Sequence, residues 1–296
     1  MTSSPQPPVS VVRENARRAD AFAPAWPFAK LALWYVASVS LTLLVWQSCI
    51  WIFHPAPYIV PTPRATYDVV VSQWSQIWPL ALGTFRETIY GYAAGAALGF
   101  LLAVAMYKIR VFRSLSYPLI IGSQAIPIIA LAPILVLVIG FNIYPTIIVV
   151  TWIVFFPVTI NTLDGFLNLD PDLLNLTRVL GATRGRRFWF VELPGVVTPL
   201  FSGLKIGAAY AVTGAIIGEQ AASSGPSLYQ FQVAANNQSR TDLVYGITIV
   251  MMIIGLLWFA VVTGLDRIFT PWKYRATARR WFRRDRTRNA SLTTND

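Results

Sequence analysis

The sequence predicts an all-α integral membrane protein with about six transmembrane helices and both termini in the cytoplasm. The chain has 296 residues, of which 55% are hydrophobic and only 12% are charged, whereas roughly a quarter of the residues in a soluble domain are charged. The charges are also unevenly distributed, because several stretches contain no Asp, Glu, Lys or Arg. These uncharged stretches are 31–63, 88–107, 114–163, 206–218 and 243–265. Most of them reach the roughly 20 apolar residues that a helix needs to cross a bilayer.

The first predicted span, 31–53, follows a polar cytoplasmic tail, 1–30. It ends at the run His54-Pro55-Ala56-Pro57, because proline cannot continue a helix. An external connector, 54–87, leads to the second span, 88–107. The second span carries small residues at a spacing that lets another helix approach closely in lipid, and we expect this face to pack on a neighbouring helix. The small residues are Gly91, Ala94, Gly95 and Gly99.

The longest uncharged stretch is too long for one crossing at a rise of roughly 1.5 Å per residue, so it must turn back on itself. The segment 141–145, with sequence Phe-Asn-Ile-Tyr-Pro, is the natural turn. This gives a third span, 117–140, and a fourth span, 145–161. Pro127 and Pro133 interrupt the third span. They indicate either a kinked packing helix or a helix that lines a cavity, where neighbouring groups can satisfy the freed carbonyls.

The fifth predicted span, 198–217, contains Lys205 near its start, and the sixth span covers 243–265. Either Lys205 is a charge in a pathway through the membrane, since ionisable residues within spans are often functional, or its ammonium group snorkels to the nearer surface. A basic tail, 266–296, completes the chain. The core membrane domain is therefore expected to cover 88–265.

The distribution of basic residues predicts the orientation. With six spans and cytoplasmic termini, 20 of the 24 Lys and Arg residues lie on the cytoplasmic side, three lie outside and Lys205 lies within a span. The positive-inside rule describes this asymmetry. The same basic segments suit contact with anionic membrane lipid, so the net charge of +11 does not indicate a nucleic-acid partner. An odd number of spans would place one basic tail on the wrong face.

The sequence lacks the motifs of several catalytic and metal sites. No G-x-x-x-x-G-K-[ST] phosphate-binding loop occurs, so we expect neither ATP hydrolysis nor a bound cofactor on this chain. H-E-x-x-H, C-x-x-C and G-x-S-x-G are also absent. The single cysteine, Cys49, excludes an intrachain disulfide. The single histidine, His54, is better explained as an interfacial residue at a helix end than as a metal ligand, because metal sites need three or four convergent ligands.

The longest cytoplasmic segment, 164–194, contains the signals of a short helix. Asp170 is a suitable cap, Pro171 suits the first helical position, and Asp172 favours the positive end of the helix dipole. Gly181 is a plausible left-handed stop that closes a helix of about ten residues. The segment is either an amphipathic connector lying on the membrane or a docking element for a cytoplasmic partner.

This segment also carries a spaced pattern, Asn175-Leu176-Thr177-x3-Gly181-x9-Val191-x-Leu193-Pro194. The pattern resembles the EAA-x3-G-x9-I-x-LP signature of bacterial ABC-importer membrane subunits. Further segments resemble the same family in the same order along the chain, over about 59–265, and point to its nitrate, sulfonate and taurine branch, which also includes transporters of thiamine precursors. They are Ile59-Val60-Pro61-Thr62-Pro63, Ala125-Ile126-Pro127-Ile128-Ile129-Ala130-Leu131-Ala132-Pro133, Gly203-Leu204-Lys205-Ile206, Gly218-Glu219 and Arg240-Thr241-Asp242.

The resemblance implies a type I ABC importer permease fold in a bacterial inner membrane. It implies three partners: an ATPase subunit that binds ATP and Mg, an extracytoplasmic substrate-binding protein, and a second permease copy, most simply a homodimer. The residues implied to couple to the ATPase are Asn175, Leu176, Thr177, Gly181, Ala182, Thr183, Arg184, Leu193 and Pro194.

The coupling segment departs from the family signature at its first position. Asn175 replaces the leading Glu of the signature, which puts a salt bridge with an ATPase arginine in doubt. A short helix still docks by shape and apolar contact. Arg184, Arg186 and Arg187 either supply polar contacts instead or anchor the loop near anionic lipid.

Polar residues within apolar spans are the candidates for the translocation path. They are Ser123, Gln124, Thr151, Thr159, Asn161 and Thr213. The alternative is that these side chains bond to helix backbones. The outer loop 219–242 is long enough for a short helix. In this loop Glu219 is either part of an outer gate or a structural ion-pair partner of Arg240.

The expected function is that of a permease subunit that passes a small solute into the cytoplasm by alternating access. A sulfonate, a nitrate-like anion and a thiamine-precursor-like heterocycle are all open as substrates. Three other classes compete with this reading. A secondary transporter would usually show embedded ionisable residues, an intramembrane enzyme needs a catalytic constellation, and a membrane scaffold leaves the ordered motifs unexplained.

Overall fold

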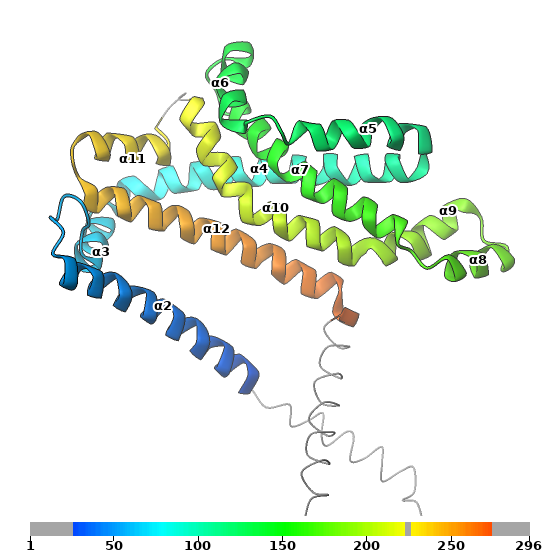
Figure 1. Cartoon of the computed structure of the whole chain (residues 1–296), viewed down its shortest axis with the longest axis horizontal. Helices are drawn as coiled ribbons and strands as arrows, with labels where there is room; N and C mark the ends of the chain where they lie inside the picture. The colour runs from blue at the N-terminus through cyan, green and yellow to red at the C-terminus, as the bar shows by residue number, and fades with distance from the viewer. Residues whose placement is uncertain (1–25, 223–225, 274–296) are drawn as a thin grey trace, which may run out of the picture. The chain divides into compact units, whose positions relative to one another are not determined.

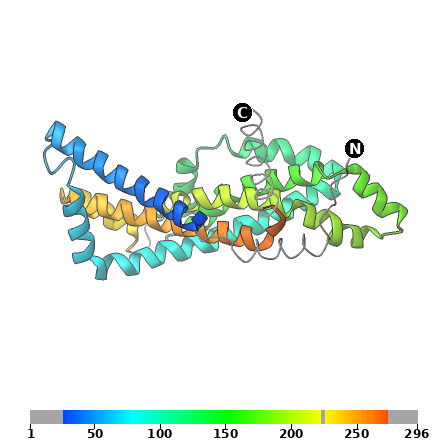
Figure 2. The same ribbon diagram turned by 90° about the horizontal axis from the view of Figure 1, so that it is seen from below.

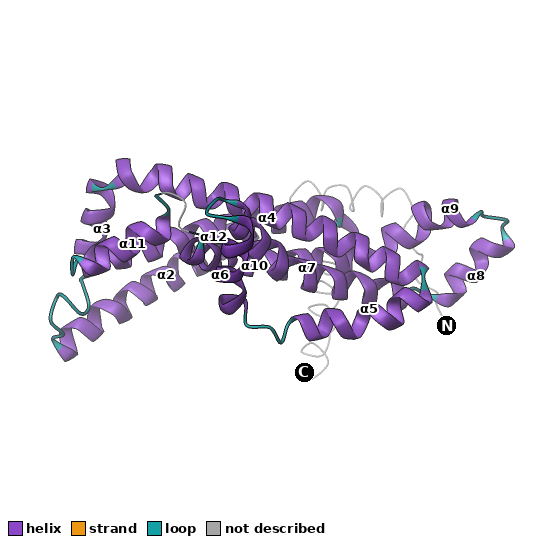
Figure 3. Cartoon of the chain, turned by 90° about the horizontal axis from the view of Figure 1, so that it is seen from above, coloured by secondary structure: helices purple, strands orange, loops and turns teal. Residues whose placement is uncertain are grey.

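A computed structural model describes residues 26–222 and 226–273 of the chain (Figure 1). Every regular element in these ranges is a helix, and loops join the helices (Figure 3). The tails predicted at 1–30 and 266–296 lie mostly outside the described residues. The chain divides into two compact units, 1–64 and 65–296. The all-α prediction is therefore confirmed for the described residues.

The first unit contains α2 (Trp26–Phe53), which matches the first predicted span. Its described apolar stretch is Ala37–Phe53. The helix ends at His54, whose backbone has a φ of 45° and whose N–H donates to the carbonyl of Ile50. A left-handed residue ahead of two prolines stops a helix firmly. This geometry agrees with His54 as a helix-end residue, and no group of potential metal ligands occurs among the described residues.

The second unit contains the long apolar helices. Four helical runs in the described ranges are long and apolar enough to cross a membrane, and a bent helix pair gives a fifth candidate span. The four runs are α4 (Trp74–Lys108), α7 (Tyr144–Leu167), the continuous stretch Arg184–Ala221, and α12 (Thr241–Phe269). The described apolar part of α2, Ala37–Phe53, is shorter than these runs, so the count of six spans stays a prediction.

The second span begins earlier than its uncharged stretch indicates. After α3 (Pro63–Ser72), α4 starts at Trp74 and includes Arg86 and Glu87. Arg86 and Glu87 interrupt the apolar sequence, but the helix continues through them. The Arg86 side chain is exposed. Pro79 lies in the second turn of α4, where few helical hydrogen bonds are lost.

The centre of the second unit is α7, which packs against α4 on one side and α10 (Leu193–Ala221) on the other, and α10 also contacts α12 (Figures 1 and 2). The predicted small-residue face of α4 makes the first of these contacts. A Cβ atom on Gly95 would lie 2.8 Å from the carbonyl oxygen of Thr151 and from Cβ of Val154. Gly91 and Gly99 approach α7 as closely, whereas Ala94 is exposed. The prediction that this face packs on another helix is confirmed.

The third predicted span, which Pro127 and Pro133 interrupt in the sequence, is broken into two helices. The chain forms α5 (Arg110–Ser123) and α6 (Ile128–Ile139), which are bent by 100° relative to each other. Pro127 has an extended backbone with ψ of 111°, which ends helical geometry before α6 begins. Pro133 stays within α6. The chain therefore breaks at the first proline, while the second lies inside α6 and removes one of its helical hydrogen bonds.

The turn and outer loop agree with the sequence. Asn142 Oδ1 accepts a hydrogen bond of 2.8 Å from the Tyr144 N–H at the start of α7. The outer loop contains α11 (Leu228–Asn237), which the Ser227 hydroxyl caps by accepting from the Gln230 N–H at 3.2 Å. Both elements depend on short polar side chains bonding to nearby backbone.

Candidate functional site

The predicted cytoplasmic helix is α8 (Pro171–Val179), and its ends have the geometry expected from the sequence. Asp170 Oδ1 accepts from the Asp172 N–H at 2.9 Å. At the other end Gly181 has a φ of 74°. Its N–H donates to the carbonyl of Arg178, and the Ala182 N–H donates to the carbonyl of Thr177, both at 3.0 Å. This pair of hydrogen bonds is a Schellman motif, which needs a residue that tolerates positive φ.

The surface of α8 is exposed along its whole length, since none of its residues is buried. The helix and the following α9 (Arg184–Arg187) lie beyond the cytoplasmic ends of α4 and α7 at the right of Figure 1. Leu176, Val179 and Leu180 expose apolar side chains there. An apolar patch on a projecting, rigidly capped helix is typical of a protein–protein contact.

The coupling residues predicted from the signature fall on this element and its flanks. Asn175 is exposed and accepts a hydrogen bond of 3.3 Å from Arg178, and the Thr177 hydroxyl donates to the carbonyl of Leu174 at 2.8 Å. Thr183 Oγ1 caps α9 by accepting from the Arg186 N–H. Leu193 and Pro194 begin α10, immediately after the short π-helix η1 (Phe188–Glu192).

A buried ion network joins this loop to the bundle. The Glu192 side chain is 0% exposed. Its Oε2 accepts from Lys108 Nζ of α4 at 2.9 Å, and its Oε1 accepts from Arg187 Nε at 2.7 Å. A buried carboxylate with two charged donors holds its neighbours in a defined geometry, because an unpaired buried charge is costly. Sequence reasoning missed Glu192, although it is an isolated acid in a basic cytoplasmic segment.

Aromatic rings extend the same junction. Tyr107 stacks on Phe166 with ring centroids 4.5 Å apart, and Phe166 stacks on Phe188 at 6.2 Å. Lys108 Nζ also lies 4.2 Å from the centroid of the Phe188 ring, a cation–π contact. The cytoplasmic ends of α4 and α7 are thereby fixed to the turn that precedes α10.

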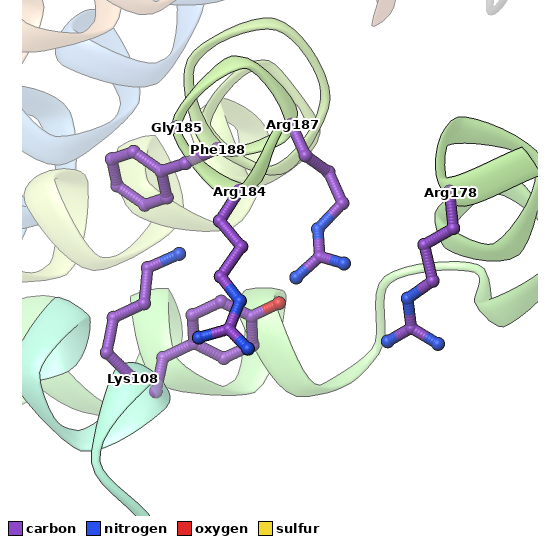
Figure 4. Close-up of a pocket in the computed structure, with 7 residues that line it drawn as sticks. Lys108, Arg178, Arg184, Gly185, Arg187 and Phe188 are labelled. Carbon is purple, nitrogen blue, oxygen red and sulfur yellow. The ribbon is translucent and has the colours of Figure 1, made fainter. Parts of the chain in front are cut away.

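A basic cleft opens beside this network, with a volume of 780 Å³. The side chains of Arg178, Arg184 and Arg187 extend from α8 and α9 toward a shared space, with Lys108 reaching in from α4 (Figure 4). Lys108 and Arg187 are bound to Glu192, whereas Arg184 forms no ion pair or side-chain hydrogen bond among the described residues. The lining residues are Tyr107, Lys108, Arg178, Arg184, Gly185, Arg187 and Phe188. We call this hollow the basic cleft.

Most residues proposed for the translocation path bond to helix backbones. The hydroxyls of Ser123 and Thr159 donate to carbonyls of their own helices at 2.6 and 2.7 Å, and Asn161 does so through its amide at 2.8 Å. Thr151 donates across to the carbonyl of Gly91 at 3.1 Å. Gln124 is exposed at the break after α5. These contacts give Ser123, Thr151, Thr159 and Asn161 a structural role, and the path assignment of all the candidates stays a prediction.

Thr213 has a different setting from the other path candidates. It lines a groove of 540 Å³ between α10 and α12, together with Thr248. The groove contains methionine and aliphatic side chains and one phenylalanine, and its lining includes no charged residue. The remaining lining residues are Ala209, Val212, Ile216, Met251, Met252, Gly255, Leu256 and Phe259.

Glu219 joins three helices at the outer end of the second unit. Its Oε1 accepts from the Thr84 hydroxyl of α4, and its Oε2 accepts from the Tyr229 N–H of α11 at 3.1 Å. Ser227 is a further hydrogen-bond partner, and no ion pair joins Glu219 to Arg240 among the described residues, so that alternative is wrong. Arg240 instead lies at the start of α12. The carboxylate is positioned to hold α11 against α4, and its role in an outer gate stays a prediction.

Lys205 forms an ion pair with α12, and its role in a pathway or its snorkelling to the surface stays a prediction. Its Nζ lies 2.7 Å from Oδ2 of Asp266, a side chain that is fully buried. The Thr270 hydroxyl donates to the other oxygen, Oδ1, at 2.8 Å. Lys205 is therefore the partner of a buried carboxylate on α12, because a buried carboxylate needs a nearby cation.

Comparison with protein families supports the fold seen here. Residues 95–273 match the model of the family described as "Binding-protein-dependent transport system inner membrane component". The formylaminopyrimidine transport permease protein ThiX of Halalkalibacterium halodurans is 32% identical over 222 residues, covering 73% of this chain and 87% of that protein. The riboflavin transport system permease protein RibX of Chloroflexus aurantiacus is 26% identical, covering 90% and 97%. The taurine transport system permease protein TauC of Escherichia coli is 22% identical, covering 83% and 92%.

Solved structures show the same fold at low sequence identity. A chain of the MetNI methionine ABC transporter, described as inward facing, superimposes with a TM-score of 0.51 at 19% identity, covering 66% of this chain and 94% of that chain. A chain of an amino acid ABC transporter with histidines gives a TM-score of 0.53 at 16% identity, covering 68% and 95%.

Proposed function

Because the chain belongs to the family of binding-protein-dependent transport system inner membrane components, and is thus an ABC importer permease subunit, we propose that α8 is the element through which a separate ATPase subunit drives it. The observation that carries this proposal is the exposed apolar surface of a helix capped at both ends. The proposed assembly contains two copies of this chain, two ATPase subunits that bind ATP and Mg, and an extracytoplasmic substrate-binding protein.

The ion network around Glu192 supports α8 as a coupling element. A push on α8 reaches the start of α10 through the loop 180–183 and α9, and reaches α4 through the Arg187–Glu192–Lys108 contacts. ATP shifts such an equilibrium only if it binds one arrangement much more tightly than the other. Contacts formed by closed ATPase subunits supply that difference, and the core helices then alternate between outward and inward openings.

Asn175, in place of the glutamate of the family signature, changes the polar part of the proposed contact between α8 and the ATPase but leaves its apolar part unchanged. A glutamate at this position would offer a carboxylate to the ATPase, whereas Asn175 offers a neutral amide that already bonds Arg178. The docking energy would then come mainly from burial of Leu176, Val179 and Leu180, at roughly 25 cal/mol per Å² of apolar surface.

The proposed substrate is a small uncharged heterocycle rather than a sulfonate. The named relatives transport a formylaminopyrimidine, riboflavin or taurine, so both classes occur among proteins similar to this chain. The groove lined by Thr213 and Thr248 carries no charged side chain, and Lys205 is paired with Asp266. A sulfonate in this groove would lose its hydration without gaining a cation.

The docking proposal is tested by co-purification of the tagged chain with its ATPase subunit from membranes in mild detergent. The variant Val179→Asp places a charge in the apolar patch, and we expect it to abolish both co-purification and stimulated ATP hydrolysis. The matched control is Val111→Asp, at an exposed position on α5. Retained ATPase binding by the first variant, or equal loss in the control, would overturn α8 as the docking element.

The substrate proposal is tested with the complete transporter in proteoliposomes that contain the binding protein. We expect a formylaminopyrimidine to stimulate ATP hydrolysis and taurine to leave it at the basal rate. Stimulation by taurine alone would reverse the proposed substrate class without affecting the docking proposal.

A further inference from the structure

The basic cleft has an excess of positive charge that no ion pair among the described residues neutralises. Four cationic side chains line it: Lys108, Arg178, Arg184 and Arg187. The carboxylate paired with two of these cations is Glu192, which supplies a single negative charge against the four positive ones. Arg178 bonds an amide oxygen at 3.3 Å, so its charge is not compensated. The cleft therefore attracts an anion whose negative charge is spread over several oxygen atoms.

The donors that remain free match a phosphate group. Guanidinium groups present several N–H donors in a plane, and this geometry suits phosphate oxygens better than a single carboxylate partner. The guanidinium groups of Arg184, Arg187 and Arg178 extend toward the same space in Figure 4. A cleft of 780 Å³ is large enough for a headgroup with its phosphate and glycerol.

The cleft also lies where lipid headgroups are expected. Tyr107 and Lys108 end the apolar run of α4, so they mark the cytoplasmic boundary of the bilayer. Directly after the cleft, Trp189 is 65% exposed and Phe190 is 78% exposed. Exposed aromatic side chains are typical of the membrane interface. A free phosphate or a nucleotide would use the cations but would leave these rings in water.

We propose that the basic cleft binds the phosphate headgroup of an anionic phospholipid from the cytoplasmic leaflet, with Arg178 and Arg184 as the principal ligands. The lipid phosphate lies between α8 and the end of α4, and its acyl chains lie against the exposed aromatic side chains. Lys108 and Arg187 keep their bonds to Glu192 and supply the surrounding positive potential. Arg178 lies on α8 and Arg184 belongs to the predicted coupling segment, so the lipid site borders the docking surface proposed for α8, and its test uses the chain without the ATPase subunit.

The test is native mass spectrometry of the full-length chain in detergent, with phosphatidylglycerol or phosphatidylcholine added at equal concentration. We expect retention of phosphatidylglycerol by the unaltered chain and little retention of phosphatidylcholine. The double variant Arg178→Gln/Arg184→Gln loses two charges of roughly 1 kcal/mol each near the surface, so its affinity for phosphatidylglycerol falls about thirtyfold.

The matched control removes two exposed charges outside the cleft, in the variant Arg86→Gln/Arg110→Gln. It should retain phosphatidylglycerol as the unaltered chain does, and circular dichroism should show equal helix content in all three proteins. Equal retention of the two lipids, or equal loss in both double variants, would overturn the proposal. Displacement of phosphatidylglycerol by millimolar inorganic phosphate would assign the cleft to a soluble anion and would also overturn it.

Discussion

Glu192→Gln is the substitution that tests the ion network most sharply. The glutamine has nearly the same shape as the glutamate but one oxygen fewer. Its Oε1 can accept from either Lys108 or Arg187, and its amide then presents N–H groups to the other cation. One of the two hydrogen bonds, now 2.9 and 2.7 Å long, is replaced by a contact between donors.

The cost follows from the burial of the carboxylate and the exposure of its partners. Removing one member of a fully buried ion pair costs roughly 3 to 5 kcal/mol. Lys108 and Arg187 are 39% and 20% exposed, so water solvates the unpaired cation in part. We therefore expect a loss of about 2 kcal/mol, close to the worth of one hydrogen bond to a charged group.

The assay measures thermal unfolding of the purified variant and the ratio of solute transported to ATP hydrolysed by the reconstituted transporter. We expect a lower melting temperature and a lower transport ratio, because α4 is released from the turn before α10. Combining Glu192→Gln with Lys108→Met leaves Arg187 with a full acceptor, so part of the stability should return. The network would be refuted if Glu192→Gln kept the melting temperature and the transport ratio of the unaltered chain. It would also be refuted if the stability losses of the two single substitutions simply added in the double variant.

Two further predictions concern glycines, each with a matched control. Gly95→Leu should lower the stability of the bundle by at least 1 to 3 kcal/mol, because its Cβ would lie 2.8 Å from the backbone of α7. Gly83→Leu, with open space around it, should change the melting temperature little, and equal effects would contradict the close packing of α4 on α7. Gly181→Ala should weaken α8 by about 1 kcal/mol, since alanine is strained at positive φ. Gly185→Ala has open space and should be neutral, as measured by proteolysis of the loop and by ATPase stimulation.

Features set by local chemistry could be predicted from the sequence. The start of α8 needs only Asp170 and Pro171, and its end needs only a residue that tolerates a positive φ, which Gly181 provides. The close approach of α4 to another helix follows from the spacing of Gly91 and Gly95. These signals lie within a few residues of the structure they determine.

Features set by distant partners could not be predicted. Glu192 and Lys108 are 84 residues apart, and Lys205 and Asp266 are 61 residues apart, so their pairing depends on how the helices pack. The break at Pro127 has the same cause, because a proline in a membrane helix kinks or breaks it according to what satisfies the freed carbonyls. Glu219 has one partner near in sequence, Tyr229, but its other partner, Thr84 on α4, is 135 residues away.

The most direct test of α8 as the coupling element is site-specific cross-linking in membranes that contain the complete transporter. The chain has a single cysteine, so a Cys49→Ser background allows one new thiol at a time. Val179→Cys on α8 should cross-link to the ATPase subunit through a short bifunctional reagent, with a yield that changes when ATP is added, whereas Val111→Cys on α5 should not. No ATPase adduct from position 179, or an equal yield from position 111, would contradict the account.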